Sequence, residues 1–88
     1  MSDPLHPSHS AVAKRLKRAG GHLNTVIAMI EAGRPCLDLA QQLHAVEAAV
    51  AAAKKALIHD HIDHCLQHAL DADGHADLAE FKEITKYL

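Results

Sequence analysis

The chain has 88 residues, a net charge of −2 with histidine counted as neutral, and 49% hydrophobic but only 2% aromatic residues. This length allows one domain, and a domain so small gains stability by associating with further copies. Apolar residues that are mostly Ala, Leu, Ile and Val favour packed helices over a sheet. The weakly negative charge excludes a uniformly basic nucleic-acid-binding protein, so any DNA contact depends on a local cluster.

The first ten residues contain two prolines and two histidines, which indicates a flexible arm before a single helical domain over residues 11–88. The arm lacks the apolar core of a signal peptide. No apolar stretch reaches the ~20 residues that a membrane span needs. We therefore expect a cytoplasmic protein, in which two cysteines are more often metal ligands or reactive thiols than a disulfide.

Apolar residues at alternating spacings of three and four predict a first helix over roughly residues 9–32, capped by Ser8 or Ser10. Its seam consists of Val12, Leu16, Ala19, Leu23, Val26 and Ile30. Two adjacent glycines in its middle indicate either the close approach of another backbone or a kink. Gly33 suits the C-terminal cap of this helix.

A second helix is predicted from about residue 36 to residue 70, because neither Gly nor Pro interrupts it after Pro35. Its seam consists of Cys36, Leu39, Leu43, Val46, Val50, Ala53 and Leu57. A helix of roughly 50 Å is too long to bury its face against one shorter helix, so we expect it to pair with a second chain. A turn over residues 71–74 and a short amphipathic helix over 76–87 follow.

Residues 59–68 hold four of the nine histidines and one of the two cysteines. His61 and Cys65 are four residues apart, so on a helix they stand one turn above each other and suit one metal ion. His64 and His68 repeat that spacing. Imidazole with thiolate suits Zn, Cu(I), Ni and Co. By itself the pattern is equally typical of a solvated helix end.

Cys36 lies at the opposite end of the same predicted helix, some 37 Å from His61 at the standard rise. It cannot join His61 within one chain. In an antiparallel pair of such helices, however, Cys36 of one chain falls beside His61 and Cys65 of the other. The alternative is a small buried thiol on the seam.

A basic cluster in the first helix is compatible with phosphate contacts, although such a run is also typical of a solvated face. It consists of Lys14, Arg15, Lys17 and Arg18. The sequence has no helix-turn-helix or zinc-finger pattern. It also has no phosphate-binding loop, no serine nucleophile motif and no third ligand with a general base, so we do not expect an enzyme.

Four segments, in order and with matching spacing, resemble the copper-sensitive operon repressor family, which also includes nickel- and cobalt-responsive, formaldehyde-sensing and persulfide-sensing repressors. The segments are RLKRAGGHL (15–23), MIEAGRPC (29–36), QQLHAV (41–46) and HDHIDHC (59–65). The resemblance implies an all-α, three-helix protomer. It further implies an antiparallel four-helix dimer and a tetramer formed as a dimer of dimers.

The resemblance also assigns site residues. It implies metal ligation by Cys36 of one protomer with His61 and Cys65 of another. It implies that Arg15 above all contacts operator DNA. The weaker candidates for DNA contact are Lys14, Lys17, Arg18, Lys54 and Lys55.

Two departures from the family's copper sensors bear on the metal. Those sensors typically have Tyr before the first Cys and a third-helix Glu that supports the His ligand, whereas here Pro35 and Phe81 align there, with Glu80 adjacent. Extra imidazoles suit metals with four to six ligands, and they are His6, His9, His22 and His64. The sequence thus favours Ni²⁺ or Co²⁺ over Cu⁺ or Zn²⁺.

We therefore expect a repressor that binds its operator without metal, releases it with metal, and controls genes of metal efflux or resistance. Drawing Cys36 toward the partner's ligands would shift the long helices and misalign the basic faces. The alternative is a metal buffer or chaperone that does not bind DNA.

Overall fold

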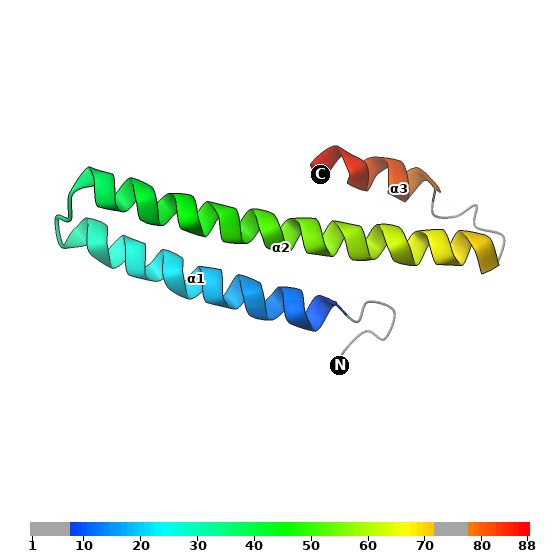
Figure 1. Cartoon of the computed structure of the whole chain (residues 1–88), viewed down its shortest axis with the longest axis horizontal. Helices are drawn as coiled ribbons and strands as arrows, with labels where there is room; N and C mark the ends of the chain where they lie inside the picture. Colours follow the sequence, from blue (N-terminus) through cyan, green and yellow to red (C-terminus); the bar gives the residue numbers. More distant parts are fainter. Residues whose placement is uncertain (1–7, 72–77) are drawn as a thin grey trace.

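The computed structural model describes residues 8–71 and 78–88, and these residues form only helices and their connections. Helix α1 (His9–Glu31) and helix α2 (Cys36–Asp71) form an antiparallel hairpin, and α3 (Leu78–Ile84) lies along α2 on its other side (Figure 1). A 3-10 helix, η1 (Thr85–Tyr87), ends the chain. The predicted all-α fold with three helices is confirmed for the single chain. Most of the predicted turn and the expected start of the third helix lie outside the described residues.

Helix α1 begins at His9, so the last two residues of the expected arm are helical. The reason is that the Ser8 carbonyl already accepts a hydrogen bond from the Val12 amide at 2.9 Å. Ser8 occupies the predicted cap position, but its hydroxyl makes no capping hydrogen bond.

Gly33 ends α1 as predicted. Its φ of 77° is the left-handed conformation that glycine adopts without steric cost. In that conformation its amide donates to the Ile30 carbonyl at 3.0 Å, and the next amide, of Arg34, donates to the Met29 carbonyl at 3.1 Å. These two bonds satisfy carbonyls that the helix end would otherwise leave open. The chain reverses within four residues, and α2 starts at Cys36.

The third helical segment is shorter than predicted. Regular α-helix stops at Ile84, and residues 85–87 tighten into the 3-10 helix. The Thr85 hydroxyl donates to the Lys82 carbonyl at 2.8 Å, which occupies one of the open carbonyls of the helix end.

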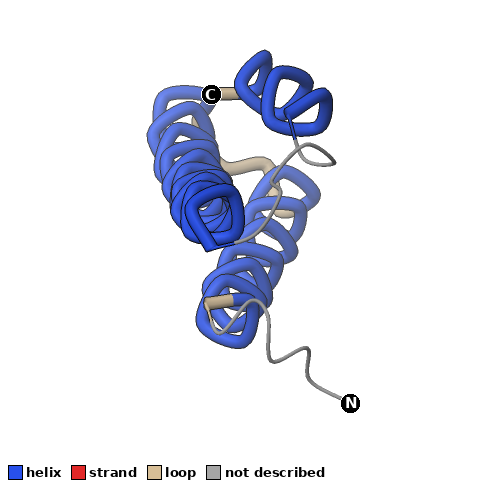
Figure 2. Tube along the Cα trace, turned by 90° about the vertical axis from the view of Figure 1, so that its right-hand side faces the viewer, coloured by secondary structure: helices blue, strands red, loops and turns tan. Residues whose placement is uncertain are grey.

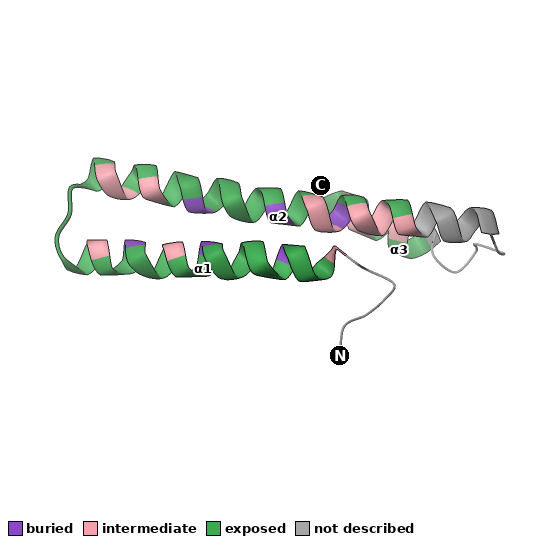
Figure 3. Cartoon of the chain, turned by 60° about the horizontal axis from the view of Figure 1, so that its bottom comes forward, coloured by how far each residue is buried: buried purple, intermediate pink, exposed green. Residues whose placement is uncertain are grey.

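The predicted seams are only partly buried within one protomer (Figure 3). The side chains below 9% exposure are Val12, Ala19 and Val26 on α1 and Val46, Ala53 and Ile58 on α2. On α1 these residues recur every seven positions, because only one row of side chains can face a single partner helix. Three seam residues that lie between them in the sequence, Leu16, Leu23 and Val50, stay more than 40% exposed.

The protomer is elongated, with extents of 57 × 28 × 13 Å. Its radius of gyration is 17.5 Å, against the ~12 Å typical of a compact domain of this length. Helices α1 and α2 form a single layer, and α3 lies outside this layer, in contact with α2 (Figure 2). Within the described ranges, no helix is both long enough and apolar enough to cross a membrane.

Candidate functional site

The imidazole of His61 contacts a carboxylate of α3. Its Nε2 lies 3.1 Å from Oε1 of Glu80, and the His61 side chain is only 16% exposed. A carboxylate accepts hydrogen bonds, so Nε2–H is the donor and the second ring nitrogen, Nδ1, carries the lone pair in the neutral ring. A ring held in this way has the orientation and tautomer that metal-binding histidines usually owe to a carboxylate partner.

This contact bears on the third-helix Glu that copper sensors of the family use. Phe81 was expected to stand in the place of the supporting Glu of copper sensors. The structure instead directs Glu80 at His61, because one residue along a helix rotates the side chain by roughly 100°. The inferred absence of a supporting carboxylate, one of three arguments for nickel or cobalt, is therefore wrong. Pro35 remains a departure from the copper-sensor pattern.

Cys36 and His61, two of the predicted ligands, do not meet within one protomer. Cys36 is an exposed thiol in the first turn of α2, and His61 follows about 37 Å farther along the same helix. The backbone of Cys65 belongs to α2, one turn beyond His61, but its side chain is outside the described residues. Among the side chains that are described, no three of His, Cys, Asp and Glu come together around one point.

The additional histidines lie at separate places. His6 is outside the described residues, and His9 is the exposed first residue of α1. His64 is half-buried on α2, close to His61 in sequence. His22 points from α1 to α2, where its Nε2 donates to Oε1 of Gln42 at 2.7 Å. That places His22 about 28 Å along α2 from His61, so the structure does not bring it to the other ligands.

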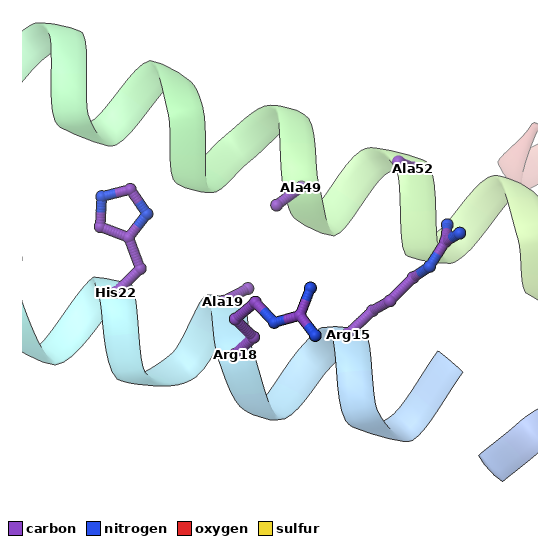
Figure 4. A pocket seen from close by; sticks show the side chains of 6 residues that line it. All are labelled: Arg15, Arg18, Ala19, His22, Ala49 and Ala52. Carbon is purple, nitrogen blue, oxygen red and sulfur yellow. The ribbon is translucent and has the colours of Figure 1, made fainter. Parts of the chain in front are cut away.

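The basic residues fall into two groups, those that line a groove between α1 and α2 and those that lie elsewhere on the surface. Arg15 and Arg18 line an open groove of about 360 Å³ between α1 and α2 (Figure 4). Lys14 and Lys17 are exposed elsewhere on α1, and neither lines this groove. Lys54 and Lys55 are exposed on α2 and lie outside it too.

The α1–α2 layer has two different faces. At roughly 100° per residue, the exposed apolar side chains lie to one side of the buried row on each helix, and we call this side the apolar face. It consists of Leu16, Leu23, Ile27, Ile30, Leu43 and Val50. By the same count Cys36 and His61 fall on the apolar face. Arg15, Arg18 and His22 fall on the other side, which we call the groove face.

Comparisons with known proteins identify the family of the chain. A family model described as a metal-sensitive transcriptional repressor matches residues 8–87. The chain therefore belongs to that family, whose members are transcriptional regulators and not enzymes. No solved structure is significantly similar to it.

Individual relatives are copper sensors by name. The chain is 35% identical to the copper-sensing transcriptional repressor CsoR of Mycobacterium ulcerans over 88 residues, covering 99% of this chain and 75% of that protein. It is 32% identical to CsoR of Mycobacterium tuberculosis H37Rv, covering 99% and 74%. It is 35% identical to CsoR of Bacillus subtilis over 80 residues, covering 85% and 79%. These relatives give no support to the preference for nickel or cobalt.

Sequence reasoning missed two features of the site region. The bond between His22 and Gln42 joins helices whose register depends on the length of the turn between them, and no motif marks it. The groove beside Arg15 exists because Ala49 and Ala52 face it, and the alanine-rich run over 48–53 was a signal for it.

Proposed function

We propose that the protein is a copper(I)-responsive repressor that binds operator DNA in the absence of metal and releases it when metal binds. The observation that carries this proposal is the contact between His61 and Glu80, which supplies the carboxylate support typical of the family's copper sensors. Membership of the metal-sensitive repressor family and the names of the relatives point the same way.

The proposed metal site combines Cys36 of one protomer with His61 and Cys65 of another. Two thiolates and one imidazole are a donor set that suits Cu(I), and the bound ion would supply a cross-link between protomers. Cys36 and His61 lie at opposite ends of α2 and on its apolar face, so an antiparallel second copy lying against that face brings them together. The exposed apolar side chains give such a copy something to bury.

The DNA-binding surface is proposed on the basic residues of α1, with Arg15 foremost and with Lys14, Lys17 and Arg18 around it. Lys54 and Lys55 are candidates from α2. Assembly as a dimer of dimers would repeat this surface, and a cytoplasmic location suits a protein that binds operators. Copper efflux or resistance genes are the expected targets. The chain's own part in release would be mechanical: binding of one ion by Cys36 of one protomer and His61 of another would fix the position of their two α2 helices relative to each other.

The test is a fluorescence-anisotropy titration of the metal-free protein against DNA from upstream of its own gene, repeated with Cu(I), Ni(II) and Co(II) at buffered free concentrations. We expect DNA binding without metal and release by Cu(I) at the lowest free concentration. Failure of the metal-free protein to bind this DNA would favour the metal buffer. Release by Ni(II) or Co(II) at free concentrations that cells hold, with Cu(I) ineffective, would restore the nickel and cobalt branch.

A further inference from the structure

The groove between α1 and α2 has two arginines and a histidine on its α1 side and two alanines on its α2 side. Arg15, Arg18 and His22 project into it from α1, while Ala49 and Ala52 face them from α2 (Figure 4). The sixth lining residue is Ala19 of the buried row. Within the part of the chain that the structure describes, no acidic side chain lines the groove to neutralise the two guanidinium groups. A group that enters would meet positive charge above short apolar side chains.

The alanines give the groove its depth. A helix pair packed with larger side chains at these positions would close the space, since neighbouring helices lie 8–10 Å apart and interdigitate. Ala49 and Ala52 each end at Cβ, which leaves about 360 Å³ beside the arginines. That volume lies within the range of small-ligand sites, and it exceeds what one phosphate group needs.

The bond between His22 and Gln42 fixes the spacing of the helices at one end of the groove. It is 2.7 Å long, partly buried, and joins side chains of α1 and α2. His22 is thereby committed to the groove face, whereas Cys36 and His61 lie on the apolar face. A second copy that covers the apolar face leaves the groove open.

We propose that this groove seats one phosphate group of the operator backbone between Arg15 and Arg18, and that the His22–Gln42 pair positions the walls around it. The inference rests on the DNA-binding function proposed above and assigns His22 to the DNA side of the protein, away from the metal ligands. Guanidinium groups hold phosphate by paired hydrogen bonds, which makes the guanidinium pair the contacting element. The alanines on the α2 side accommodate the C–H surface of the adjoining deoxyribose.

The experiment fills the groove without changing any charge. Ala52→Leu and Ala49→Leu are compared with Ala51→Leu, an exposed position of the same helix that does not line the groove. Operator affinity is measured at several salt concentrations, together with circular dichroism, oligomeric state and Cu(I) affinity. We expect the two groove variants to bind operator about tenfold to a hundredfold more weakly, with a salt slope lower by about 1 for each groove engaged. Ala51→Leu should behave as wild type, and Cu(I) affinity should not change.

Four further variants keep the test decisive if leucine disturbs the helix pair. Arg18→Gln leaves the packing in place and should lower both affinity and salt slope. Gln42→Ala should lower affinity while leaving the salt slope unchanged, because it removes a positioning bond and no charge. His22→Gln, which keeps a donor for Gln42, should recover most of the affinity that His22→Ala loses.

The outcomes separate the two proposals. If wild type binds no DNA, the function proposed above fails and takes this inference with it. If wild type binds operator and every groove variant binds equally well, only the groove assignment is overturned. Inorganic triphosphate is the remaining probe: should it bind wild type but not Ala52→Leu while operator binding is the same in both, the groove serves a free phosphate compound and not DNA.

Discussion

Nε2 of His61 and Oε1 of Glu80 are 3.1 Å apart, although one belongs to the long second helix and the other to the last α-helix. Helix α3 has to fold back along α2 for this contact to form. Glu80 is 62% exposed, so the contact adds little to stability, and its proposed role is to orient the ring.

Replacing Glu80 by Gln tests this role. Carboxylate partners of metal-binding histidines contribute 10–100-fold to metal affinity, and we expect a decrease of about that size for Cu(I). The free energy of unfolding should change by less than about 1 kcal/mol. A competition titration with a Cu(I) chelator measures the affinity. Glu83→Gln is the control, since Glu83 is on the same segment and pairs with Lys86 at 2.7 Å. Equal affinities in both variants would refute an orienting role.

Cys36→Ala should separate metal sensing from folding. The thiol is exposed at the start of α2, so its removal should change the free energy of unfolding by no more than about 0.5 kcal/mol. DNA binding by the metal-free protein should persist, and Cu(I)-driven release should be abolished. Anisotropy titrations with and without Cu(I) measure both. Release that survives in this variant would leave Cys36 only a packing role on the apolar face.

Arg15→Ala should weaken operator binding and reduce its salt slope by about 1 for each phosphate that Arg15 neutralises, because a neutralised phosphate releases counterions. Affinity for metal should stay the same, since Arg15 is on the groove face. Arg34→Ala is a matched control: Arg34 is also exposed but pairs with Asp38 at 3.4 Å beside the turn. A slope that changes in the control and not in Arg15→Ala would move the DNA surface to the turn.

Metal preference is tested with the double variant His6→Ala/His9→Ala. With two thiolates and one imidazole as the Cu(I) donor set, Cu(I) affinity and Cu(I)-driven release should match wild type. Isothermal titration with Ni(II) provides the contrast, because Ni(II) affinity falls only if these histidines are ligands. A failure of Cu(I)-driven release in the double variant would contradict the proposed donor set.

Val26 and Ile27 are adjacent in the sequence, but one is expected to stabilise the fold and the other the dimer. Val26 is fully buried within the protomer, so Val26→Ala should lower the free energy of unfolding by about 1–3 kcal/mol. Ile27 is 46% exposed on the apolar face, and Ile27→Ala should instead raise the dissociation constant of the dimer, by about tenfold. Chemical denaturation and sedimentation equilibrium measure the two effects. A dimer unaffected by Ile27→Ala would place the interface elsewhere.

The sequence predicted the helices well because their signals are local. The alternating seam and Gly33 predicted the end of α1 to within one residue. The uninterrupted run after Pro35 predicted both ends of α2 as closely. Which residues of each seam are buried within the protomer and which stay exposed was not predictable, since Leu16 and Ala19 follow the same periodicity. Only the three-dimensional structure shows that Ala19 faces α2 while Leu16 does not.

The site was predictable as a set of residue types but not as a set of contacts. The spacing of His61 and Cys65 and the distance to Cys36 follow from helix geometry alone. The choice between Glu80 and Phe81 does not, because it depends on the path by which α3 returns to α2. The pairing of His22 with Gln42 likewise depends on the register of two helices, which periodicity leaves open.

The single layer formed by α1 and α2 has a thermodynamic consequence. Only the row of Val12, Ala19 and Val26 with its partners on α2 separates the apolar face from the groove face. A change in helix spacing imposed at one face thus alters the other directly. If metal weakens operator binding by some factor, reciprocity requires bound operator to weaken metal binding by that same factor. Substitutions in the dividing row outside the groove, such as Val12→Ala, should then change this coupling free energy without touching either ligand.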